Sequence, residues 1–139
     1  MTRSILTSVV VLAIALIGCR KNDTVSPSTE NTPVVANTAN AFSFTLAATS
    51  YTATNQYTMS FSTDTIACSL TITGKTTGSG SLTVADSNYS IVYADSSLNN
   101  QVTAFTQSGK GIPKRISIVF NDYTGTITFA LARQGNAIR

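Results

Sequence analysis

The chain has 139 residues, of which 42% are hydrophobic and 11% are charged, and its formal net charge at pH 7 is +3. This length suits one small domain, and the nearly balanced charge argues against a nucleic-acid-binding protein. The sequence contains no histidine, which excludes Ser-His-Asp and Cys-His catalytic arrangements and the commonest zinc ligand.

The N-terminus has the three parts of an export signal. Arg3 supplies a positive charge, residues 5–17 are mostly apolar, and Leu-Ile-Gly-Cys closes the segment at residues 16–19. The apolar run is too short for a transmembrane helix, which needs about 20 residues. These features resemble a bacterial lipoprotein signal peptide with its lipobox. The resemblance implies removal of residues 1–18 and a lipid on the thiol of Cys19, whereas the alternative is an ordinary signal peptide with an incidental cysteine.

The residue after Cys19 bears on location. In the enteric sorting rule an aspartate there retains a lipoprotein in the inner membrane, and this chain has Arg20 instead. The resemblance therefore implies the outer membrane, with the periplasmic and surface faces both left open. The segment that follows, up to residue 40, is rich in Asn, Thr and Ser and has no apolar period. We expect residues 19–40 to be a lipidated cysteine and a flexible tether.

From residue 41 onward, apolar and polar residues alternate along successive short runs, which is the period of a β-strand. The apolar positions of these runs are, in chain order, Phe42, Phe44 and Leu46, then Tyr57, Met59 and Phe61, then Ile66, Cys68, Leu70 and Ile72, then Leu82 and Val84, then Ile91 and Tyr93, then a weaker run from Val102 to Thr106, then Ile116, Ile118 and Phe120, and finally Ile127, Phe129 and Leu131. Turn-like segments separate them at residues 74–80, 86–88, 95–100, 108–113 and 121–125. The pattern predicts that residues 41–139 form an all-β domain, an antiparallel β-sandwich of about seven or eight short strands.

The last part of the chain carries a family resemblance. Residues 80–84, Asp86, residues 116–120 and residues 124–131 resemble the closing strands of small exported sandwich modules, such as the pre-peptidase C-terminal and CUB-like domains. The resemblance covers about 50 residues. It implies a module that binds or supports rather than catalyses, and no functional residue carries over to this chain.

Catalytic chemistry is sparse. If Cys19 is lipidated, Cys68 has no disulfide partner. Cys68 falls on the same side of its strand as Ile66, Leu70 and Ile72, which we expect to point inward. We therefore expect Cys68 to pack in the core rather than to act as a nucleophile. The spacing of the aspartates predicts no paired carboxylates. We therefore expect no enzyme activity, no cofactor and no metal site.

Two sets of residues are candidates for binding. Lys110, Lys114 and Arg115 lie close together and could form a patch for acidic glycans or phosphates. The alternative is a solvated loop whose charges discourage pairing at a strand edge. Tyr51, Tyr89 and Tyr123 lie at or near predicted loops, where planar rings can stack on sugars, whereas we expect Tyr57 and Tyr93 to face the core.

These patterns predict a lipid-anchored envelope lipoprotein with a non-catalytic binding or structural module. Its partners would be the membrane, through the lipid on Cys19, and a glycan, an envelope polymer or a protein, but no nucleic acid. The alternative is an accessory or inhibitor protein that faces the periplasm and acts by protein–protein contact.

Overall fold

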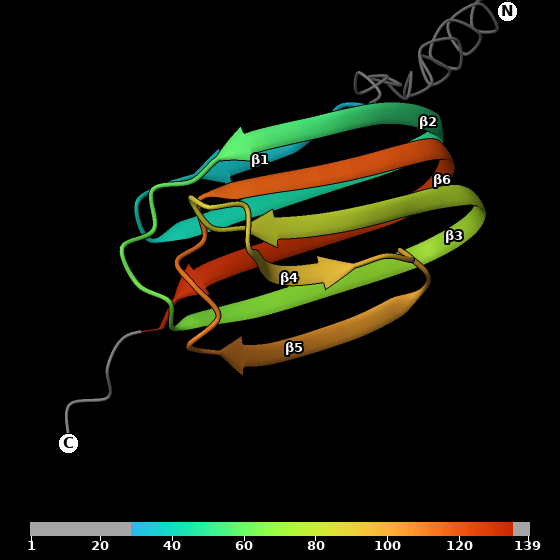
Figure 1. The fold of residues 1–139 in the computed structure, drawn as a ribbon. Coiled ribbons are helices and arrows are strands. Elements are labelled where there is room, and N and C mark those ends of the chain that lie inside the picture. The colour runs from blue at the N-terminus through green and yellow to red at the C-terminus, as the bar shows by residue number, and fades with distance from the viewer. Residues whose placement is uncertain (1–28, 135–139) are drawn as a thin grey trace, which may run out of the picture.

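The computed structural model describes residues 29–134, which form one six-stranded antiparallel sheet (Figure 1). The strands are β1 (Val34–Asn37), β2 (Ala41–Thr58), β3 (Ile66–Ala85), β4 (Ile91–Asp95), β5 (Gln101–Gln107) and β6 (Arg115–Arg133). Their order is β1-β2-β6-β3-β4, and β5 also pairs with β3. The all-β prediction is confirmed. The described residues include no helix that could span a membrane, and the predicted signal peptide and Cys19 lie outside them.

Three strands are much longer than the sequence pattern indicates. β2 has 18 residues, β3 has 20 and β6 has 19. β3 and β6 each contain two of the expected short runs, whereas β2 contains the first run and only Tyr57 of the second, because Met59 and Phe61 follow the strand. The first half of β2 pairs with the second half of β6, as at Phe44 and Phe129, and the pairing continues to Tyr57 and Ile116. Residues 29–134 therefore contain six strands rather than seven or eight. The expected turns at 74–80 and 121–125 lie inside strands, at places where the register shifts instead of reversing.

The sheet folds over at these irregular positions, where β2, β6 and β3 bend together (Figure 1). The inner faces of the two halves then pack against each other. Phe44 in the first half of β2 stacks on Phe120 in the first half of β6, with ring centres 6.2 Å apart. Tyr93 of β4 stacks on Phe129 in the second half of β6 at 6.1 Å. The shared core thus joins the two halves.

Most side chains expected in the core are buried. They include Phe42, Phe44, Leu46, Ile66, Leu70, Ile72, Leu82, Val84, Ile116, Ile118, Phe120, Ile127, Phe129 and Leu131. Tyr57 and Tyr93 pack against this core from its margin, as predicted. β4 differs from its prediction, because Val92 is buried and Ile91 is 63% exposed. The pairing of β4 with β3 shifts register between Val84 and Ala85. The shift rotates this part of β4, so that Val92 rather than Ile91 points into the core.

The predicted tether also needs correction. Val34–Asn37, inside the range 19–40, form strand β1 and pair with residues 42–45 of β2. Asn31 adds a backbone hydrogen bond to the carbonyl of Ala47, at 2.7 Å. β1 shows no alternation because it is an edge strand in which none of the four side chains is fully buried. Backbone pairing, which leaves no side-chain period, holds this segment to the sheet.

The bend brings backbone segments into close approach. Gly78 has a φ of +74°, and a Cβ there would overlap the backbone carbonyl of Asp122 in β6. Gly125 has a φ of +153°, and a Cβ there would lie 2.9 Å from the Cα of Lys75. Glycine is therefore required at both positions for steric reasons as well as for backbone conformation.

The variant Gly78→Ala should lose more stability than Gly74→Ala. Both glycines lie in the left-handed region, at +74° and +64°, but a Cβ on Gly74 would have no neighbour within 4 Å. Gly74→Ala should therefore cost only the conformational term, about 1–2 kcal/mol. Gly78→Ala should cost about 1–3 kcal/mol more, because the overlap forces the strands apart. Urea unfolding of both variants measures the difference, and equal losses would show that the bend has room for a methyl group.

A groove on the outer face of the sheet

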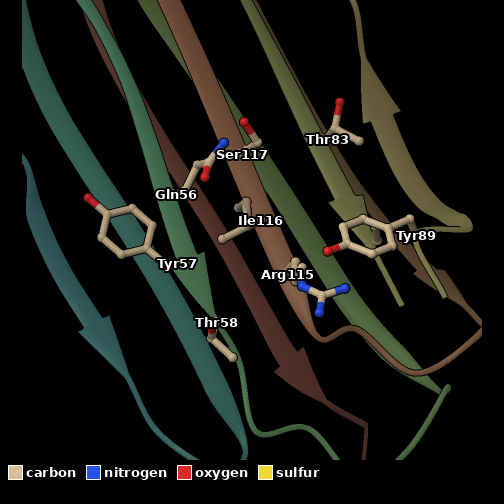
Figure 2. A pocket seen from close by; sticks show the side chains of 9 residues that line it. Gln56, Tyr57, Thr58, Thr83, Tyr89, Arg115, Ile116 and Ser117 are labelled. Atoms are coloured by element: carbon tan, nitrogen blue, oxygen red, sulfur yellow. The ribbon is translucent and has the colours of Figure 1, made fainter. Parts of the chain in front are cut away.

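A groove of about 540 Å³ crosses the outer face of the sheet where β2, β6 and β3 run side by side (Figure 2). Two rows of paired positions cross this face. Ser117 of β6 pairs with Gln56 and Thr83, and Arg115 of β6 pairs with Thr58 and Ala85. Paired residues in an antiparallel sheet point to the same side. These six side chains therefore lie on one face. The groove is also lined by Tyr57, by Ile116 and by Tyr89 from the loop between β3 and β4.

The groove has polar and apolar surface in similar amounts and carries one positive charge. Gln56 contributes an amide, whereas Thr58, Thr83 and Ser117 contribute hydroxyl groups. Each hydroxyl can donate and accept one or more hydrogen bonds, and neighbouring strands place these groups about 4.8 Å apart. Arg115 is the one charged residue among those that line the groove. The groove thus suits a hydroxyl-rich or anionic ligand.

Tyr89 is held in an unusual conformation. Its φ is +63°, which is uncommon for a bulky residue. The carboxylate of Asp86 accepts hydrogen bonds from the backbone N–H groups of Asn88, at 2.8 Å, and Ser90, at 2.9 Å. The N–H of Tyr89 donates to the carbonyl of Asp86 at 3.3 Å. These bonds fix the turn, and the tyrosine side chain is left 73% exposed.

Arg115 and Tyr89 contact each other at the edge of the groove (Figure 2). The guanidinium carbon of Arg115 lies 4.1 Å from the centre of the Tyr89 ring. One guanidinium nitrogen, Nη1, also donates a hydrogen bond to the carbonyl of Ser87 at 3.2 Å. The stacking and the hydrogen bond orient the guanidinium, whose other N–H groups suit a carboxylate or phosphate.

The other predicted cations do not reach the groove. Lys114 donates a hydrogen bond from Nζ to the carbonyl of Phe61 at 2.6 Å, so it braces the connection between β2 and β3. Lys110 is exposed and is not among the residues that line the groove. Of the three basic candidates, only Arg115 therefore belongs to the site. Lys114 directly precedes β6 and its side chain is bound to the carbonyl of Phe61, whereas Arg115 is the first residue of β6 and contacts Tyr89.

The three predicted tyrosines differ in their exposure. Tyr51 is half-buried and meets the ring of Phe120 edge-on at 5.5 Å. Tyr123 is fully buried, so its predicted place on an exposed loop is wrong. It lies inside β6 with its side chain toward the core, and burial raises the pKa of its hydroxyl. Only Tyr89 of the three is both exposed and beside the groove.

Sequence analysis missed the neutral members of the groove, Gln56, Thr58, Thr83 and Ser117. Each lies at a polar position of an alternating strand, which places it on an outer face. The alternation of one strand does not show which outer positions of other strands lie beside it. That information is in the register between β2, β6 and β3.

Comparison with protein-family models found no match, and neither did comparison with curated proteins. Within residues 29–134, no group of three or more His, Cys, Asp or Glu side chains is placed to hold a metal ion. The groove is therefore interpreted from its own residues.

Cys68 should be unreactive in the folded protein. It is only 3% exposed, and burial raises the pKa of its thiol to about 12. The reactive thiolate is therefore scarce at neutral pH. In a Cys19→Ser background, iodoacetamide should leave the native protein unmodified up to about pH 9 and modify it rapidly in concentrated urea. Native alkylation that rises about tenfold per pH unit would instead indicate an accessible thiol with an ordinary pKa.

Proposed function

We propose that this protein is a lipid-anchored envelope lipoprotein whose β-domain, a β-sandwich built from the folded sheet, binds a saccharide in the groove. The observation that carries the proposal is Tyr89. It combines a strained left-handed backbone with a ring that is 73% exposed beside the groove. Glycine or asparagine would suit this turn better. A bulky aromatic at such a position supports a role outside the folding of the domain.

A saccharide fits the groups around Tyr89. One face of the ring is covered by Arg115, and a sugar would stack its C–H face on the other. Sugar hydroxyl groups would exchange hydrogen bonds with Gln56, Thr83 and Ser117 along the floor. The guanidinium of Arg115 would favour a glycan that carries a carboxylate or a phosphate.

The location proposed for this activity rests on the N-terminal sequence. The lipobox at residues 16–19 supports a lipid on Cys19, and Arg20 supports the outer membrane. Stable anchoring needs two or more acyl chains. The anchor would keep the groove close to envelope polymers, whichever side of the membrane it faces. The absence of histidine from the sequence supports a binding role without catalysis.

A second candidate is an accessory or inhibitor protein that binds another envelope protein. Two exposed apolar side chains favour it. Ile91 is 63% exposed and pairs with Ala85 of the groove, and Val119 is 39% exposed two residues beyond Ser117 on the same strand face. With Tyr89 they add exposed apolar surface to this part of the sheet. Aromatic and arginine side chains are enriched at protein interfaces.

Replacing Tyr89 by glycine should separate binding from stability. Glycine removes the ring and relieves the left-handed strain, which offsets the lost contact with Arg115. The unfolding free energy should stay level or rise by up to about 1 kcal/mol. Retention on an array of neutral, uronate-bearing and phosphorylated bacterial oligosaccharides should fall to background.

Two charge variants provide matched controls for this measurement. Arg115→Gln should weaken retention of the uronate-bearing or phosphorylated glycans by about tenfold or more, which corresponds to about 1.4 kcal/mol. Lys110→Gln removes the same charge outside the groove and should leave retention unchanged. If the wild-type protein binds no glycan but Tyr89→Gly releases a co-purifying envelope protein, the second candidate is the correct one.

Cys19→Ser should abolish lipidation. The variant lacks the thiol that receives the diacylglyceryl group, so the protein should lose radiolabel from palmitate. Cys68→Ala is the control, because it removes the other cysteine and should retain the label. Label on the Cys19→Ser variant would contradict the proposed anchor.

A further inference from the structure

The folded sheet has four edges. β1 and the second half of β2 border it on one side, and β5 and β4 border it on the other. The outer backbone groups of an edge strand have no partner within the sheet, so they can pair with a strand from another chain. Proteins usually blunt such edges with proline, charge, bulges or covering side chains.

Two of the edges are short or interrupted. β1 has only four residues and directly follows Pro33. β4 has five residues, contains a register shift and ends in Asp95. The carbonyl of Val92 in β4 already accepts a hydrogen bond from Nε2 of Gln107 at 2.6 Å. Neither edge offers a long regular ladder.

The second half of β2 is also interrupted. Its register shifts between Ala48 and Tyr51 and again between Tyr51 and Ala53. At its end the carbonyl of Thr58 accepts a hydrogen bond from the side-chain amide of Asn37 at 2.8 Å. This edge therefore begins at a bulge and is capped at its end.

β5 lacks these protections. Its seven residues pair with β3 without a register shift, from Gln107 to Gln101, and none is charged or a proline. Within residues 29–134, no loop or side chain hydrogen-bonds to the backbone of β5 apart from the ladder with β3. Val102 at its outer face is 79% exposed. β5 is therefore a regular, uncharged and open edge.

We propose that this edge pairs antiparallel with β5 of a second copy, with the two-fold axis at Ala104. This axis pairs all seven residues of the strand, Gln-Val-Thr-Ala-Phe-Thr-Gln at 101–107, and matches the glutamines at its two ends. Pairing places each Gln101 opposite Gln107 of the other copy, Val102 opposite Thr106, and Thr103 opposite Phe105. β-Branched and aromatic pairs stabilise a sheet, and no like charges meet. The register also keeps the inward and outward faces of both copies aligned.

Charge and area set the strength of this contact. Residues 29–134 contain five basic side chains (Lys75, Lys110, Lys114, Arg115 and Arg133) and five acidic ones (Glu30, Asp64, Asp86, Asp95 and Asp122), so their net charge is zero. Two copies do not repel each other through net charge.

A seven-residue strand is only about 24 Å long, and a stable interface buries about 800 Å² on each partner. The dimer is therefore weak, and it forms where copies are concentrated, as on a membrane surface.

Cysteine crosslinking in the full-length protein in its membrane tests both the partner and the register. In the proposed dimer the two Ala104 side chains face each other, with Cβ atoms about 5 Å apart, so Ala104→Cys should form a disulfide dimer on mild oxidation. The unsubstituted protein controls for Cys68. Ala132→Cys, on an exposed outer position of the central strand β6, should give at least fivefold less dimer.

Charged substitutions then test the edge itself. In the Ala104→Cys background, Val102→Lys places one lysine on each paired edge, opposite Thr106 of the other copy. Because charge on an edge strand discourages pairing, it should reduce the dimer by about tenfold. Val34→Lys makes the same change on the exposed side chain of the opposite edge strand, 62% exposed, and should have no effect. The proposal is overturned if Ala104→Cys stays at the unsubstituted background, if Ala132→Cys crosslinks equally well, or if the adduct contains a different protein. None of these outcomes depends on glycan binding.

Discussion

The bend shared by β2, β3 and β6 is the constraint on which the rest of the structure depends. A single sheet of six strands would leave both faces exposed to water. Because the three long strands bend together, one face of each half becomes the inner wall of a common core. Gly78 and Gly125 permit the close approach of backbones at this bend. Ladder hydrogen bonds continue on both sides, so the bend interrupts little pairing.

Within residues 29–134 this core forms without a disulfide crosslink. Cys68 is a free, buried thiol. The two halves are joined instead by rings that cross between them, such as Phe44 against Phe120 and Tyr93 against Phe129. None of the described residues that are buried is charged or polar in type, so the core bears no penalty for charge burial. The outer faces contribute little to this packing, which leaves them free to carry the side chains of the proposed binding site, such as Tyr89 and Arg115.

Local sequence patterns predict the inward side chains but not the arrangement of the strands. Alternation has a period of two residues, so it identifies Ile66 and Leu70 as core residues without any knowledge of the fold. It could not show that the glycine-rich segment at 74–80 is a bend rather than a chain reversal. The same ambiguity at 121–125 placed Tyr123 on a loop, although its side chain is buried. In the groove, Tyr89 and Arg115 were each predicted as candidates for binding. Gln56 and Ser117 could not be predicted in the same way, because they become neighbours only through strand pairing between residues about 60 positions apart.

The two proposed surfaces are compatible because they lie on different parts of the sheet. The groove is formed by the second halves of β2 and β3 and the first half of β6, whereas β5 pairs with the first half of β3. Edge-to-edge pairing at β5 would therefore leave the groove of each copy open. A dimer would then present two grooves to one repetitive polymer, which can raise avidity about 10²–10⁴-fold without any new contact. Weak stacking on a single tyrosine would suffice for retention under this arrangement, since each anchored pair would engage the polymer twice.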